Sequence, residues 1–266
     1  MEVTEGHLLG GRIRYTQPRD GYRTGIEPVL LAAAVPARAG DRVLEAGTGA
    51  GAGLLCLLAR VPGLMAIGVE IDPAMAGLAR HNLAANGLAA EIVTGDVLQG
   101  AWAADHVFAN PPWHAQRSTA SPLPRRQLAK QQSGSGVSGW ISVLAASASA
   151  TMTLILPADR AAAAGAELAA AGLTAVVLQE LLPKWDQAAK LALVQARRGE
   201  AATERRPGFV LHETDGRFTP ATEMVLRDGT FFPLPPPSGE GSSLSRPVQE
   251  RVTAMPSNGG RGLSES

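Results

Sequence analysis

The sequence is poor in several residue types, and each scarcity excludes a class of protein. Its 266 residues include a single cysteine, Cys56, which excludes an internal disulfide and a cysteine-rich zinc site. The five histidines show no metal-ligand spacing such as H-E-x-x-H, so no metal is expected. The N-terminus has no signal-peptide pattern, and no apolar run of about 18 residues occurs. We therefore expect a cytoplasmic protein that does not bind a membrane.

Aromatic residues are also scarce, at 4% of the chain, although 45% of it is hydrophobic. This composition predicts an α/β core in which small side chains pack helices closely on a sheet. Cys56 lies in an apolar stretch and is interpreted as a small core residue. Trp102, Trp140 and Trp185 are likewise interpreted as packing residues.

Acidic residues are absent between Asp105 and Asp159, although the whole chain has a formal net charge of zero. Four basic residues lie in this interval: Arg117, Arg125, Arg126 and Lys130. An ordinary solvated loop would show the same charges. The N-terminal leader, residues 1–39, adds Arg12, Arg14, Arg19 and Arg23. These arginines and the basic residues of the acid-free interval together favour contact with nucleic-acid phosphates.

Strand-like and helix-like segments alternate along most of the chain. The strand-like segments are 42–46, 65–70, 91–95, 105–109, 151–156, 174–182 and 190–198. The helix-like segments are 52–60, 74–86, 138–149 and 158–171. This alternation predicts a doubly wound, mostly parallel sheet of seven strands, with its functional site at the carboxyl ends of the strands.

A glycine-rich turn follows the first of these strands. Gly47, Gly49 and Gly51 would let the backbone approach a ligand, at the start of a helix whose first amides are unpaired. Gly47, Gly49 and Ala52 also satisfy the G-x-G-x-x-G/A dinucleotide fingerprint of dehydrogenases. Glu45, two residues before Gly47, would be poorly placed beside a pyrophosphate. It suits the cationic amino group of S-adenosylmethionine.

Acidic residues follow the next two strands. Glu70 could accept hydrogen bonds from both hydroxyls of a ribose. Asp72 precedes Pro73 and is interpreted as a helix N-terminal charge. Asp96 could accept from an adenine amino group or cap a turn, and its pattern leaves both alternatives open.

The motif Asn110-Pro111-Pro112-Trp113 follows the strand-like run Val107-Phe108-Ala109. Proline has no backbone N–H, so the Asn110 side-chain oxygen and the Pro111 carbonyl would have no competing internal donor. Trp113 offers a flat face for stacking. A strand-terminating turn would explain the motif alone, but the upstream acids and glycines favour chemistry on an amino group.

In this order and spacing, these motifs resemble Rossmann-like S-adenosylmethionine methyltransferases that act on amino groups. The resemblance covers residues 40–200. The leader from Leu8 to Leu31 is similar to that of bacterial tRNA1(Val) (adenine-37 N6)-methyltransferase-like proteins. Glu45 replaces the usual Asp, and Trp113 replaces the commoner Tyr or Phe. Both replacements keep the required carboxylate and stacking face.

The resemblance implies a domain organisation and a set of site residues. Residues 1–39 would cover the cofactor and 40–232 would form the methyltransferase domain, while the Pro-, Ser- and Gly-rich composition of 233–266 predicts a disordered tail. Within these, 207–228 is expected to form a hairpin and a short helix capped by Thr219. The implied cofactor site comprises Gly25, Glu45, Gly47, Gly49, Gly51, Glu70, Ile71, Asp96 and Val97. The implied catalytic residues are Asn110, Pro111, Pro112 and Trp113. The basic interval that follows them makes Arg117, Arg125 and Arg126 the expected RNA contacts.

The expected activity is methyl transfer to adenine N6 in tRNA by a monomer. Glutamine-N5 methylation of release factors is the second hypothesis, because such enzymes use the same motif. They carry a helical substrate domain before the glycine turn, whereas about 40 residues precede it here. RNA guanine-N2 methylation ranks third. A catalytically silent binding module would leave the intact motifs unexplained, and a nicotinamide dehydrogenase would leave Asn110-Pro111-Pro112-Trp113 unexplained.

Overall fold

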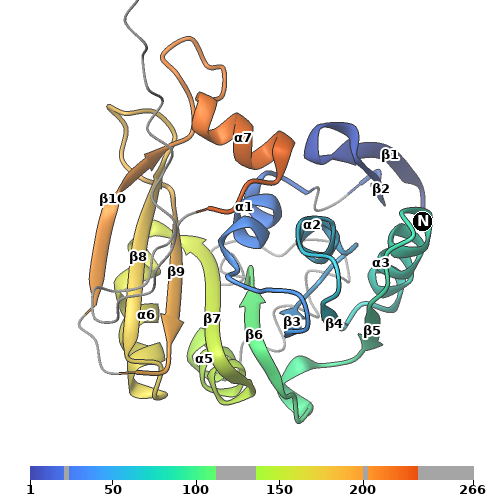
Figure 1. The fold of residues 1–266 in the computed structure, drawn as a ribbon, viewed down its shortest axis with the longest axis horizontal. Coiled ribbons are helices and arrows are strands. Elements are labelled where there is room, and N and C mark those ends of the chain that lie inside the picture. The colour runs from blue at the N-terminus through green and yellow to red at the C-terminus, as the bar shows by residue number, and fades with distance from the viewer. Residues whose placement is uncertain (21–23, 112–135, 200–202, 233–266) are drawn as a thin grey trace, which may run out of the picture.

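The computed structural model describes residues 1–20, 24–111, 136–199 and 203–232. An eight-stranded sheet forms its centre, and a two-stranded hairpin precedes it (Figure 1). The hairpin consists of β1 (Val3–Leu8) and β2 (Ile13–Pro18). The sheet strands are β3 (Arg42–Ala46), β4 (Met65–Glu70), β5 (Glu91–Thr94), β6 (Ala104–Ala109), β7 (Ala148–Pro157), β8 (Ala175–Leu182), β9 (Leu191–Arg197) and β10 (Glu204–Val210). The seven predicted strands are confirmed.

The strand order is β10-β8-β9-β7-β6-β3-β4-β5. Strands β3 to β7 pair in parallel, whereas β9 is antiparallel to both β7 and β8. The carboxyl ends of β3 to β8 therefore meet at one edge of the sheet, while β9 begins there.

The predicted strand number was wrong, because β10 adds an eighth strand at the edge beside β8. Residues from Pro207 onward were expected to form an appended hairpin, but within the described residues 203–232 this hairpin is reduced to the bridge between His212 and Phe218. Pro207 lacks an N–H, and the pairing register shifts between Arg206 and Phe209. An edge strand tolerates such a bulge, although the proline weakens the strand pattern in the sequence.

Helices cover both faces of the sheet. They are α1 (Glu27–Ala34), α2 (Ala52–Arg60), α3 (Pro73–Ala85), α5 (Gly136–Ser147), α6 (Ala161–Ala170) and α7 (Pro220–Asp228), with short 3-10 turns η1 (Leu9–Gly11), η2 (Val97–Gln99) and η5 (Ala158–Arg160). The four predicted helices are confirmed, and α1 is an additional helix within the leader. Thr219 caps α7 as predicted, accepting from the Thr222 amide.

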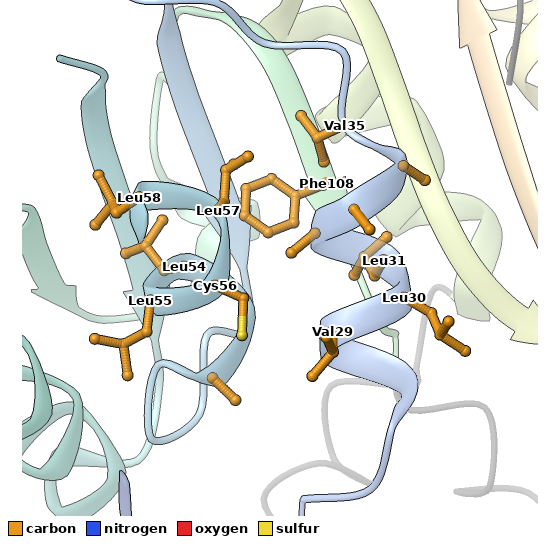
Figure 2. Close-up of a cluster of buried hydrophobic side chains, with 14 of the residues drawn as sticks. Val29, Leu30, Leu31, Val35, Leu54, Leu55, Cys56, Leu57, Leu58 and Phe108 are labelled. Carbon is orange, nitrogen blue, oxygen red and sulfur yellow. The ribbon is translucent and has the colours of Figure 1, made fainter. Parts of the chain in front are cut away.

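Two hydrophobic clusters lie on opposite faces of the sheet. Val43 and Phe108 pack with α1 and α2 on one face, as the close-up of Phe108 between these helices shows (Figure 2). Leu44 and Val107, their neighbours along the strands, pack with α5 and α6 on the other face. This alternation is the period of two that a strand requires, and it confirms the doubly wound architecture. Cys56 is buried in the first cluster.

Within the described residues, the helices are too short or too polar to span a bilayer. The same residues contain no cluster of three or more potential metal-binding side chains.

Candidate cofactor and acceptor site

The predicted cofactor and acceptor motifs meet at the carboxyl edge of the sheet. Strand β3 lies between β4 and β6, and Ala46 pairs with Ala109 across the β3–β6 ladder. The next residues along the two strands, Gly47 and Asn110, therefore leave the sheet side by side. This register brings the glycine turn to the acceptor motif, although more than 60 residues separate them in the sequence.

The glycine turn depends on left-handed backbone conformations. Gly47, Gly49 and Gly51 have φ angles of 71°, 56° and 89°, which residues with a Cβ rarely adopt. The Gly47 amide donates to the Val69 carbonyl at 2.9 Å, and the Gly51 amide donates to the Thr48 carbonyl at 2.8 Å. The turn is therefore anchored to β4, and α2 begins directly after it.

Glu45 is buried beneath the turn, with only 5% of its surface exposed. Its carboxylate accepts hydrogen bonds from the Thr48 hydroxyl and, at 3.0 Å, from the Leu54 amide. A Cβ at Gly53 would collide with this carboxylate, so a larger residue there would displace Glu45 from its present position. Burial raises the pKa of Glu45 to about 8, although both hydrogen bonds act to lower it. Glu45 braces the turn, and its contact with the cofactor amino group stays a prediction.

Glu70 joins the end of β4 to the glycine turn. It accepts hydrogen bonds of 2.8 Å from the amides of Gly49 and Asp72, one at each carboxylate oxygen. Desolvation by burial raises the pKa of Glu70, and these backbone bonds oppose the shift. Asp72 caps α3 by accepting from the amides of Ala74 and Met75, in agreement with its interpretation as a helix N-terminal charge.

Asp96 and Val97 lie beside Glu70, because the Gly95 amide donates to the Glu70 carbonyl at 2.9 Å. The Asp96 carboxylate accepts from the Leu98 amide at 3.0 Å and so caps η2. Its capping role is therefore present, while its role toward adenine stays a prediction. Ile71 is half-buried between β4 and α3, and Val97 is buried.

The acceptor motif is described only at its start. Asn110 is half-buried and Pro111 is buried at the end of β6. Pro112, Trp113 and the predicted RNA contacts Arg117, Arg125 and Arg126 lie outside the described residues. Their proposed roles stay predictions.

The leader reaches the predicted cofactor residue Gly25 through Thr24. The Thr24 amide donates to the Gln17 side-chain oxygen at 3.0 Å, and the Thr24 and Tyr15 hydroxyls are 2.8 Å apart. Gly25 then precedes α1, and a Cβ there would collide with the Glu27 carboxylate.

Sequence reasoning missed three residues that shape the turn, Thr48, Gly53 and Asn82, and it also missed Asn86, which binds the Arg14 backbone of the hairpin. Asn82 is fully buried on α3 and donates to the Ala50 carbonyl of the turn at 2.9 Å. Two asparagines four residues apart share one helix face, and asparagine is a poor helix former. The four-residue spacing of Asn82 and Asn86 was the sequence signal for this contact face of α3.

Trp185 differs from its interpretation as a packing residue, because 71% of its surface is exposed. It lies in the 183–190 connection between β8 and β9, at the same edge of the sheet as Asn110. Trp140 does pack: its ring atom Cη2 would lie 3.5 Å from a Cβ placed at Gly47. Trp102 is half-buried and donates from its indole N–H to the Val97 carbonyl at 2.7 Å.

Comparison with known proteins matches residues 26–134 to the family model of the methyltransferase small domain. Two curated relatives are both named release factor glutamine methyltransferase. The protein from Deinococcus radiodurans is 38% identical over 87 residues, which are 32% of this chain and 31% of the relative. The protein from Rhodospirillum rubrum is 36% identical over 113 residues, which are 40% of this chain and 33% of the relative. The chain thus spans about a third of each relative's length.

A solved structure from Agrobacterium tumefaciens, described as a predicted O-methyltransferase, has a similar fold. Its TM-score is 0.59 at 24% identity, and the match covers 75% of this chain and 94% of that protein. The α/β Rossmann-like methyltransferase fold is therefore confirmed. The family match supports S-adenosylmethionine as the cofactor, and with the fold it supports an S-adenosylmethionine-dependent methyltransferase.

The described residues fit this cofactor. Three left-handed glycines leave the turn without side chains where a ligand would approach. A carboxylate has about four acceptor positions, more than the neighbouring backbone amides occupy at Glu70, so ribose hydroxyls have acceptors there. Glu45 supplies a second carboxylate under the same turn.

Proposed function

We propose that this chain transfers a methyl group from S-adenosylmethionine to an exocyclic amino group, with adenine N6 in tRNA as the first candidate acceptor. The observation that carries the proposal is the pairing of Ala46 with Ala109, which places Asn110 beside the glycine turn. A donor held by the turn and an acceptor held by Asn110 would then meet at one edge of the sheet.

The amine lone pair of adenine is delocalised into the ring, so the nitrogen is a poor nucleophile. Hydrogen bonds from its N–H groups to the Asn110 side-chain oxygen and the Pro111 carbonyl would draw the nitrogen toward tetrahedral geometry. They would also stabilise the positive charge that develops during transfer, an effect of about a few kcal/mol. The bound cofactor supplies the electrophilic methyl group. Holding the amine next to it provides the remaining acceleration.

The exposed Trp185 favours a nucleic-acid acceptor. Strands lie about 4.8 Å apart, so the end of β8, three positions from β6 in the strand order, lies about 14 Å from the end of β6. A single-stranded segment whose target base is bound at Asn110 could therefore continue along this edge of the sheet and stack another base on Trp185. Lys184 and Lys190 lie in the same connection as Trp185 and supply cations for phosphates, although the Lys184 ammonium also donates to the Thr214 carbonyl at 2.8 Å.

The second candidate is methylation of a glutamine side-chain amide. Both curated relatives are named release factor glutamine methyltransferase, and this favours the alternative. Asn110 and Pro111 would act on a planar amide nitrogen in the same way as on adenine, so the acceptor geometry suits both substrates.

The test is methylation in vitro with methyl-labelled S-adenosylmethionine. Parallel reactions would contain total tRNA, ribosomal RNA and a purified bacterial release factor, followed by mass spectrometry of nucleosides and of tryptic peptides. Asn110→Ala serves as the inactive control. Label in N6-methyladenosine from tRNA supports the first candidate. Label in methylglutamine replaces it with the second, and label in N2-methylguanosine replaces it with the third-ranked guanine activity.

A further inference from the structure

Asn82 connects the N-terminal hairpin to the glycine turn through its side-chain amide. Its Oδ1 atom accepts from the Thr16 amide at 2.8 Å, and its Nδ2 atom donates to the Thr16 carbonyl at 2.8 Å. The same nitrogen donates to the Ala50 carbonyl at 2.9 Å. The side chain is fully buried, and all three partners are backbone groups.

Asn86 repeats part of this pattern one helical turn later. It accepts from the Arg14 amide at 2.8 Å and donates to the Arg14 carbonyl at 2.7 Å. Four residues of a helix rise about 6 Å and two residues of a strand rise about 6.7 Å, so both asparagines can serve alternate residues of β2. The two asparagine side chains of α3 thus bind backbone N–H and C=O groups of β2 that a third strand could otherwise pair with.

Only the Asn82 bond of this pattern reaches the glycine turn. Ala50 lies between Gly49 and Gly51, both in left-handed conformations. The turn also rests on α3 directly, because a Cβ at Gly51 would lie 3.3 Å from the Ala79 Cβ. Fixing the Ala50 carbonyl therefore fixes the peptide plane between Ala50 and Gly51, in the middle of the turn.

We propose that Asn82 is a positioning residue for the cofactor: it couples the N-terminal hairpin to the glycine turn, so that each holds the other in its binding geometry. The coupling continues through β2, because Tyr15 and Gln17 hold Thr24 beside Gly25. The proposal rests on cofactor binding at the turn and is independent of the methyl acceptor.

A merely structural role would lower stability without a specific effect on cofactor binding, and two matched variants separate these possibilities. Gln195→Ala removes another buried amide that donates to a backbone carbonyl, that of Ala34 at 2.8 Å, on strand β9. Asn86→Ala removes the neighbouring contact with β2 and leaves the Ala50 bond in place. Both are compared with Asn82→Ala.

The experiment measures calorimetric affinity for S-adenosylhomocysteine in full-length proteins, at a temperature where denaturation curves show each variant to be folded. Asn82→Ala should weaken binding by about 10- to 100-fold, the size expected when buried polar groups lose their partners. Asn86→Ala and Gln195→Ala should stay within about 3-fold of wild type, because neither disturbs the bond to Ala50. Hydrogen exchange should also rise in residues 47–53 of Asn82→Ala and in neither control.

Three results would overturn the proposal: wild-type affinity in folded Asn82→Ala, an equal loss in Gln195→Ala, or wild-type protein that does not bind the ligand. If Asn82→Ala does not fold, Thr16→Pro removes the N–H that donates to Asn82, together with the threonine side chain and the freedom of φ at this position of β2. Unchanged affinity in that variant would overturn the proposal too. If the binding results support the role of Asn82 but wild-type protein does not methylate tRNA, the proposed acceptor is refuted and the role of Asn82 is not.

Discussion

The Gly49 amide donates a hydrogen bond of 2.8 Å to the Glu70 carboxylate, which links the glycine turn to the end of the neighbouring strand. The acid that is predicted to bind ribose therefore also holds the loop that is predicted to surround the rest of the cofactor. A substitution at Glu70 is expected to act through both effects.

Glu70→Ala should weaken S-adenosylhomocysteine binding by about 1–3 kcal/mol, because ribose hydroxyls and the Gly49 amide lose an acceptor. Isothermal titration calorimetry measures the effect, with NAD as a negative control ligand. NAD binding without binding of the methyl-transfer product would contradict the cofactor assignment.

Asp72→Ala is the matched control for Glu70→Ala. Asp72 is two residues away and caps α3, so its loss should cost about 0.5–2 kcal/mol of stability. Cofactor affinity should remain near that of wild type. An equal loss of affinity in both variants would mean that the β4–α3 junction, and not the Glu70 carboxylate, determines binding.

Asn110→Ala should lower turnover by about 100- to 1000-fold, the loss typical of removing one preorganised polar group from a transition state. Affinity for S-adenosylhomocysteine should be almost unchanged, because Asn110 is assigned to the acceptor side. Single-turnover kinetics measures this rate on the substrate that the methylation test identifies as the acceptor. Near-normal turnover would leave Asn110 as a turn former only.

The stability of the protein without cofactor should fall as the pH rises from about 5 to 8, through Glu45. Its pKa is raised to about 8 in the folded state from an ordinary value of 4.5, so the folded state binds the proton more tightly. The stabilising contribution of Glu45 is fully present below its ordinary pKa of 4.5, and it is lost as the pH rises through the folded-state pKa of about 8. Its slope is at most about 1.4 kcal/mol per pH unit.

Urea denaturation of wild type and Glu45→Gln at several pH values measures this contribution as the difference between the two proteins. Saturating S-adenosylhomocysteine should reduce the slope if its ammonium group meets Glu45, because a nearby cation favours the charged carboxylate. Parallel curves for the two proteins without ligand would show that Glu45 is ionised in the folded state.

Trp185→Ala should raise the KM for an RNA substrate by about 5- to 100-fold, the range expected for one lost base–aromatic stack. Trp185→Phe should retain most of the interaction. Stability and cofactor affinity should not change, because the side chain is largely exposed. Steady-state kinetics on tRNA tests this, and an unchanged KM would assign Trp185 no part in RNA binding.

Local patterns predicted much of the fold. Alternating apolar segments located β3 to β9, and Thr219 before Pro220 located the start of α7. They failed at β10, because Pro207 interrupts the strand pattern and only an edge position beside β8 accommodates it. They also failed at Trp185, since burial depends on what packs around a residue.

The residues of the site also divide into those that the sequence predicted and those whose role only the structure revealed. The sequence by itself determined the glycine turn and the acids at the ends of β3 and β4, because a left-handed backbone favours glycine and cofactor binding requires carboxylates at the ends of strands. Only the tertiary structure decided that Glu45 braces the turn and that Asn82 joins the turn to the hairpin. These contacts link residues through space, and asparagine or glutamate in the sequence carries no mark of the distant backbone group that it binds.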